Sequence, residues 1–242
     1  MHAMTRPLRA LLTATAFLAS SAALATPVVF FGENQAPKGG VSGAPVTAHD
    51  AFLARLHNVN GQGFESLAVG TGTPTTLGFA GSNGQLDATL HGAGSIVSAT
   101  GVGRYNTTAG GANFVEVLGD FSISFSQGIS AFGFYGTDIG DFGGQITLGL
   151  AGGGSTTLSL DSLSNGADGA LLFFGFVDSA ASYTSITFDN TQKDDLFAID
   201  DLFIADRGQL ASAVPEPGSA ALMLIALAGM AAAARRRKPR QL

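Results

Sequence analysis

Apolar and polar residues alternate along several stretches in the middle of the chain. Residues 121–126 read FSISFS, with an apolar side chain at every second position. Side chains on a strand point alternately to two faces, so this period predicts a β-strand with one apolar face. The same alternation at 146–150 and 158–160, on either side of three consecutive glycines, predicts a β-hairpin.

Other stretches predict further strands. Residues 170–177, ALLFFGFV, are apolar on both faces, as in a central strand covered from two sides. SITFDN at 185–190 and LFAIDDLFIA at 196–205 complete the series. Many short strands separated by glycine turns are typical of an antiparallel sandwich. We therefore expect a mainly β protein with a jelly-roll-like β-sandwich.

One segment has the period of a helix instead. In residues 47–57, TAHDAFLARLH, the apolar positions roughly follow a 3.6-residue repeat, and Thr47 is a suitable N-cap. The preceding residues 26–46 contain three prolines and several glycines, and we expect them to form a loop. The body is thus predicted to hold one short helix at 47–57.

The N-terminus has the features of a secretory signal peptide. Residues 1–9 carry two arginines and no acid, an apolar run extends over 10–24, and the small residues Ala23 and Ala25 end it. A basic region, a short apolar region and small residues before the cleavage site define such a peptide. We expect 1–25 to be removed during export, although a buried N-terminal helix is the alternative.

The C-terminus has a second apolar segment. Residues 220–234 are uncharged, and as a helix they would span roughly 22 Å, against roughly 30 Å of bilayer hydrocarbon. Cations beside a membrane span stay on the cytoplasmic side, so the basic tail predicts that the body lies outside the inner membrane. The segment could be a lasting anchor, a buried helix or a signal that is removed. The residues flanking it are Val214, Pro215, Glu216 and Pro217 before it and Arg235, Arg236, Arg237 and Lys238 after it.

The order and spacing of these C-terminal residues resemble the PEP-CTERM sorting signal of Gram-negative bacteria, also catalogued as the ice-binding protein C-terminal domain. The resemblance covers 214–240, and shorter stretches such as GFESL and FAIDDL make the body similar to other exported PEP-CTERM proteins. It implies processing by an exosortase-like transpeptidase in the inner membrane. It also implies a place in exopolysaccharide or biofilm, at the cell surface or outside the cell, after anchoring by 220–234.

The body between the two basic ends of the chain is acidic. Residues 26–213 form one predicted domain with five cations and 17 acids, a net charge of −12 against −6 for the whole chain. Such a surface is repelled by phosphate backbones, which argues against nucleic-acid binding. The chain has no cysteine, so disulfides and thiol chemistry are excluded.

Acidic residues suggest a cation site. Calcium takes six to eight oxygen ligands. Carbohydrate-binding jelly rolls often hold a structural calcium between an early Phe-Glu and a late Asp-Asp, and Phe64-Glu65 and Asp200-Asp201 resemble that pair. The resemblance implies a calcium site at Glu65, Asp200 and Asp201. Alternatively, the aspartates are hydrogen-bonding residues at a strand edge.

A glycan is the other candidate ligand, because aromatic rings stack on sugars. Without tryptophan, the best candidates are Tyr105 and Tyr135, beside polar stretches. Asp138 and Asp141, in a glycine-rich turn, could form a second cation or ligand loop. All four could instead be structural: tyrosines of a sandwich and Asx-turn aspartates.

Catalysis has little support. Motifs such as HExxH, GxSxG, a Walker loop or GxGxxG are missing from the sequence, and the few glutamates of the body form no paired motif. We therefore predict an exported, non-enzymatic surface or matrix protein. A calcium-dependent carbohydrate-binding module is the alternative, and a hydrolase using Glu65 or Glu116 is a more distant one.

Overall fold

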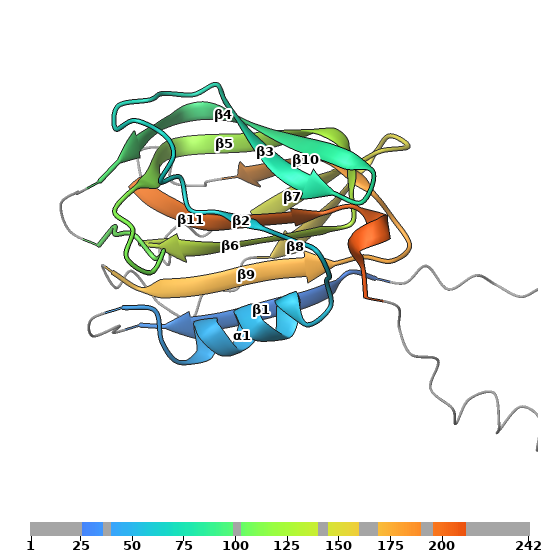
Figure 1. Cartoon of the computed structure of the whole chain (residues 1–242), viewed down its shortest axis with the longest axis horizontal. Helices are drawn as coiled ribbons and strands as arrows, with labels where there is room; N and C mark the ends of the chain where they lie inside the picture. Colours follow the sequence, from blue (N-terminus) through green and yellow to red (C-terminus); the bar gives the residue numbers. More distant parts are fainter. Residues whose placement is uncertain are drawn as a thin grey trace, which may run out of the picture.

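The computed structural model describes residues 26–35, 40–98, 103–139, 145–159, 169–189 and 196–211. Within them the chain forms strands, one α-helix and one 3-10 helix, η1 (Figure 1). The elements are β1 (Val28–Asn34), α1 (Ala44–Leu53), β2 (Gly61–Gln62), β3 (Thr75–Gly81), β4 (Gly84–Val97), β5 (Phe114–Ile129), β6 (Ala131–Thr137), β7 (Gln145–Leu150), β8 (Ser155–Ser159), β9 (Leu171–Val177), β10 (Tyr183–Asp189), β11 (Leu196–Ala205) and η1 (Arg207–Gln209). The protein is therefore mainly β, with one short helix.

The strands form one antiparallel sheet that curls over itself. Its order is β1-β9-β6-β11-β5-β10-β7-β8, with β4 also paired to β5 and β3 paired to β4. The long strand β5 joins the two halves, because its first part pairs with β11 and its remainder pairs with β10. In Figure 1, β5, β11, β6, β9 and β1 follow one another from the top of the view to the bottom, where α1 lies beside β1. The main apolar core draws its residues from strands of both halves.

The strand patterns predicted from the sequence are confirmed. Phe121, Ile123 and Phe125 are buried on one face of β5, and β7 and β8 form the expected hairpin. The doubly apolar stretch is β9, which is covered on both sides. Phe174 and Phe176 belong to the main core, whereas its other face packs in a second apolar cluster beneath α1. β9 shows no alternation of apolar and polar residues because each of its faces packs in an apolar cluster.

The expected loop at 26–46 is wrong in part, because it contains β1. This strand pairs with β9 over its whole length, from Val28 opposite Val177 to Asn34 opposite Leu171. Its exposure does not alternate, so the pairing with β9, far away in the sequence, holds it in place. The run Val28–Phe31, of β-branched and aromatic residues, was the local signal for this strand.

The predicted helix is present but shifted toward the N-terminus. α1 begins at Ala44, three residues earlier than expected, and Gly43 rather than Thr47 is its N-cap. Pro45 lies in the first turn, where a missing N–H costs nothing. Pro45, Ala48 and Phe52 form its buried face. Among the described residues, no helix is both long and apolar enough to cross a bilayer; the segment 220–234 lies outside them.

Candidate functional site

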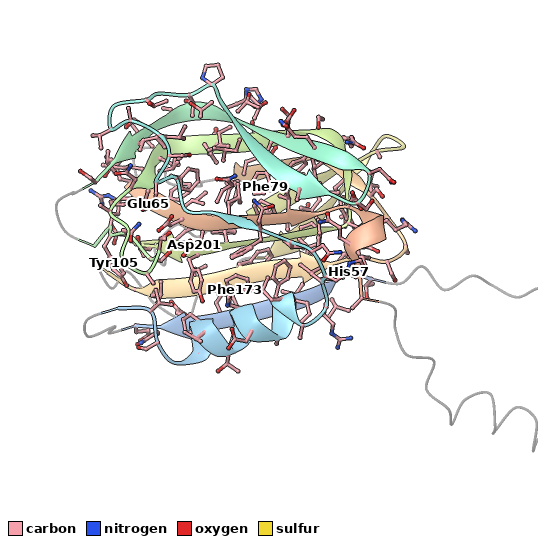
Figure 2. The ribbon with its side chains drawn as sticks, viewed as in Figure 1. His57, Glu65, Phe79, Tyr105, Phe173 and Asp201 are labelled. Atoms are coloured by element: carbon pink, nitrogen blue, oxygen red, sulfur yellow. The ribbon has the colours of Figure 1, made fainter. Side chains whose placement is uncertain are left out.

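Two of the carboxylates singled out in the sequence, Glu65 and Asp201, lie at one end of the sheet (Figure 2). Ile199 and Leu202 of β11 point into the main core. A bulge between Asp200 and Phe203 lies here, and Asp201 takes a positive φ of 45°. Glu65 follows Phe64, a buried residue whose φ of 60° is also positive. These backbone turns position the acidic side chains beside the loop at 103–113.

Asp200 binds that loop through one oxygen. Its Oδ2 accepts the backbone N–H groups of Thr107 at 2.6 Å and Thr108 at 3.1 Å, and the Thr107 hydroxyl at 3.0 Å. Asp201 accepts the Thr108 hydroxyl at 2.6 Å and lies 3.0 Å from the Thr107 hydroxyl. Two neighbouring aspartates thus hold two consecutive threonines.

Glu65 holds the two ends of the same loop. Its carboxylate accepts the N–H groups of Ala112 and Asn113, each at 2.9 Å, and the Asn106 amide, also at 2.9 Å. The Asn106 Nδ2 atom donates in addition to the Asn113 carbonyl at 2.8 Å and to Asp200 Oδ2 at 3.1 Å. Three acceptor oxygens therefore converge on one side-chain nitrogen. We call Glu65, Asp200, Asp201 and Asn106–Thr108 the acid–loop cluster.

Burial changes the chemistry of Asp200. The residue is 1% exposed, and loss of hydration, followed by the charge of Asp201, raises its pKa from 3.8 to about 7. Hydrogen bonds from Thr107 and from the Asp201 N–H act in the opposite direction. Asp200 consequently changes its charge near neutral pH.

The start of the loop is held by an ion-pair network. The Arg104 guanidinium donates to Glu116 and to Asp138, each at 2.7 Å. Asp138 has a positive φ of 57° and accepts the Gly169 N–H at 3.4 Å. In this structure Asp138 therefore binds its own chain. Asp141 lies outside the described residues.

The two candidate tyrosines are buried to different degrees. Tyr105 is half-buried and its hydroxyl donates to the Gly169 carbonyl at 3.3 Å. Tyr135 is 4% exposed, and its ring lies 5.1 Å from that of Phe173 and 5.4 Å from that of His49. Tyr135 thus offers no open ring face to a sugar, and only Tyr105 retains an accessible part.

The cluster as arranged does not fit calcium. The sequence prediction that Glu65 and Asp200 come together is met, because both accept the Asn106 amide. Their oxygens, however, already accept N–H and O–H donors, whereas calcium requires six to eight oxygens around it. Among the described residues, no group of three or more His, Asp or Glu side chains is arranged to hold a metal ion.

The loop residues are the part of the site that sequence reasoning missed. No role was predicted for Asn106–Thr108 from the sequence, although in the structure they donate hydrogen bonds to all three carboxylates. The sequence did contain a signal for them. Two aspartates inside the apolar run AIDDLF need hydrogen-bond donors when they are buried, and the short polar run Asn106–Thr108 can supply such donors.

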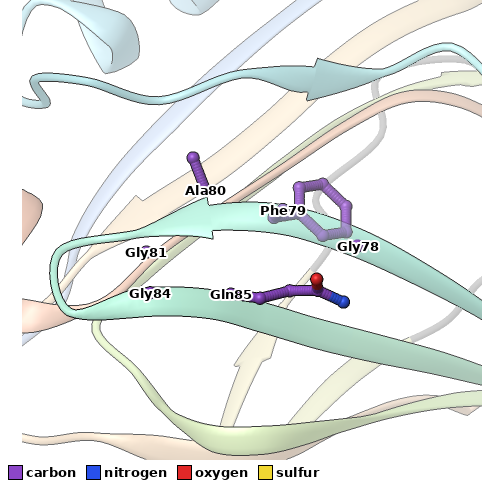
Figure 3. A pocket seen from close by; sticks show the side chains of 6 residues that line it. All are labelled: Gly78, Phe79, Ala80, Gly81, Gly84 and Gln85. Carbon is purple, nitrogen blue, oxygen red and sulfur yellow. The ribbon is translucent and has the colours of Figure 1, made fainter.

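A separate pocket has no reactive side chain in its lining. It measures about 520 Å³ and lies on the β3–β4 hairpin, where Gly78, Phe79, Ala80, Gly81, Gly84 and Gln85 line it (Figure 3). None of these side chains titrates. Phe79 is buried in the main core. We therefore place the candidate site at the acid–loop cluster.

Comparison with known proteins identifies the C-terminus. The crystal structure of the K2 cleaved adhesin domain of Lys-gingipain is similar at 19% identity, covering 60% of this chain and 97% of that chain, with a TM-score of 0.34. No curated protein matches the chain. The model of the PEP-CTERM protein-sorting motif matches residues 213–238. The predicted sorting residues 214–217 and 235–238 fall within this match but outside the described part of the structure. The chain thus carries a PEP-CTERM sorting motif, which implies an exported protein that an exosortase sorts to the cell surface.

Proposed function

We propose that this protein is a non-enzymatic component of the cell surface or of the extracellular polysaccharide matrix. The PEP-CTERM motif at 213–238 is the observation that carries the proposal, because it implies an exported protein that is sorted to the cell surface. After C-terminal processing, the body is released or stays attached at the surface. We further propose that the curled sheet is a jelly-roll-like sandwich, a common scaffold for surface modules.

The acid–loop cluster supports a structural role. The three carboxylates of the cluster bind the chain's own Asn106–Thr108 segment. Arg104 likewise binds Glu116 and Asp138. These groups give the loop one fixed shape, which suits a rigid surface for a matrix partner. The body's net charge of −12 makes a neutral polysaccharide a better partner than an acidic one.

The proposal is tested with exopolysaccharide from the host and the protein recovered from its surface. We expect the protein to sediment with the polysaccharide and to release no new reducing ends. Release of reducing ends that is lost in Glu65→Gln or Glu116→Gln would make the protein a hydrolase instead. Failure to sediment with any fraction of the matrix would contradict a matrix role.

A calcium-dependent carbohydrate-binding module is the second candidate. It is favoured by the three oxygens, from Glu65, Asn113 and Asp200, that converge on the Asn106 amide. A cation at this point would have to displace that amide. If the amide stays, the melting temperature after EDTA treatment does not change when excess calcium is added. A rise with calcium, together with glycan binding that EDTA abolishes, would favour the second candidate.

A further inference from the structure

The two ends of the described chain meet at the end of the sheet opposite to the acid–loop cluster. Thr26 and Ala211 line one groove of about 220 Å³. The Ala211 N–H donates to the Arg55 carbonyl at 2.7 Å, which fixes the last described residue beside the turn that follows α1. Figure 2 shows His57 at this end and Glu65, Tyr105 and Asp201 at the other.

The groove is mostly apolar. Val28 and Phe30 of β1, Val177 of β9 and Leu210 line it, and we call it the terminal groove. Val28 is 52% exposed and the adjacent Val29 is 43% exposed. Few large apolar residues of the described chain are this exposed, and of these two only Val28 lines the groove, because Val29 points to the other face of β1. An apolar surface of this kind is a usual place for a binding partner.

One cation, Arg55, lines the terminal groove. Its side chain is exposed and has no polar partner within the described part of the chain. The other described arginines differ in this respect: Arg207 donates to the Ser179 carbonyl at 2.7 Å, and Arg104 pairs with two acids. In a body with a net charge of −12, an unpaired cation is a specific point of attraction for an acid.

The residues that follow Ala211 match the groove in composition, because they offer apolar side chains and one acid. Val214, Pro215, Glu216 and Pro217 follow Ala211 by three to six residues. Five residues reach roughly 17 Å when extended, so Glu216 can reach Arg55. The prolines favour an extended polyproline conformation, which apolar grooves recognise. Arg55 offers Glu216 a cation on a body that carries 17 acids and five cations.

We propose that the Val214–Pro217 segment docks in the terminal groove of its own chain, with Glu216 paired to Arg55. Valine and the prolines contact the apolar walls while the carboxylate meets the guanidinium. This inference rests on the sorting role of the motif, but it concerns how the motif is presented.

A disulfide trap tests the docking directly, since the natural chain has no cysteine. Val28→Cys and Pro215→Cys are introduced together into the full chain, and the rate of intramolecular disulfide formation is measured in detergent. Adding Arg55→Glu should lower this rate about two- to fivefold, the effect of losing an exposed ion pair. Adding Glu216→Arg to that variant should restore the rate.

Arg207→Glu is the matched control, because it makes the same charge change at the same end. Arg207 does not line the groove and contacts its wall only through the Ser179 carbonyl. We expect it to leave the rate unchanged. An Arg55→Glu rate equal to that of the parent pair, or an equal decrease with Arg207→Glu, would overturn the docking proposal. The rate of disulfide formation measures contact within the chain. A negative result would therefore not affect the proposed sorting to the surface.

Discussion

Asp200 is the buried charge on which the acid–loop cluster depends. It is 1% exposed, and its Oδ2 atom accepts donors from three consecutive residues, Asn106 to Thr108. Burial and the neighbouring Asp201 raise its pKa to about 7. The folded chain therefore binds a proton at Asp200 more strongly than the unfolded chain does.

This difference predicts how stability depends on pH. Because the folded pKa lies above the unfolded value of 3.8, the contribution of Asp200 is complete below about pH 4 and is lost as the pH rises through about 7. The shift corresponds to a loss of up to roughly 4 kcal/mol of unfolding free energy. Urea unfolding at pH 5, 6, 7 and 8 should show a smaller decrease for Asp200→Asn. Parallel pH profiles would contradict the assignment.

The Asn106 amide is the residue that joins the two sides of the cluster. Asn106→Ala removes the donor that Glu65, Asp200 and the Asn113 carbonyl share. Removing donors from charged acceptors costs about 1–3 kcal/mol of unfolding free energy. Asn83→Ala is the control, because that exposed amide donates only to the Ser82 hydroxyl. Equal urea midpoints for the two variants would show that the amide does not stabilise the fold.

At the scale of elements, α1 packs closely against glycines of the sheet. A Cβ at Gly32 would lie 2.2 Å from the Ala44 carbonyl oxygen, and one at Gly133 would lie 3.0 Å from the Phe52 ring. Gly133 and Gly175 are partners on β6 and β9. The helix can therefore approach the sheet closely because neighbouring strands have no side chain beneath it.

Gly175→Ala tests this close approach. Its Cβ would lie 2.9 Å from Phe52 Cδ2 and 3.2 Å from the Phe132 carbonyl oxygen, so the helix or the ring must move. Such overpacking costs about 1–3 kcal/mol of unfolding free energy in urea titrations. Gly152→Ala is the matched control, because its Cβ meets no atom within 4 Å. The packing account would be wrong if both variants unfolded at the same urea concentration.

Local patterns predicted the elements whose own residues determine them. β5 and the β7–β8 hairpin have alternating burial, and β9 has two apolar faces because two clusters cover it. β1 escaped prediction because the prolines and glycines of 26–46 outweighed its short run of β-branched and aromatic residues, whose partner β9 is far away in the sequence. The same limit applies to the site. The meeting of Glu65 with Asp200 was predictable from their resemblance to a known pair. The identity of their donors was not: the Asn106 amide donates to Glu65, and the Thr107 N–H donates to Asp200.

At the scale of the whole molecule, the fold separates attachment from the candidate site. Thr26 and Ala211 line the terminal groove, whereas Glu65, Tyr105 and Asp201 lie at the opposite end (Figure 2). A body held at the surface through its C-terminus would therefore turn the acid–loop cluster outward. The sequence alone could not predict this polarity, because it depends on where distant strands end.

The central claim is that the PEP-CTERM motif is a sorting signal that is processed. The intact mass of the protein from its own host, measured separately in membranes and in culture medium, tests this most directly. We predict a species that starts at Thr26 and ends near Pro215–Pro217, found outside the membrane fraction. A species that still ends at Leu242 and occurs only in membranes would contradict the account and make 220–234 a lasting anchor.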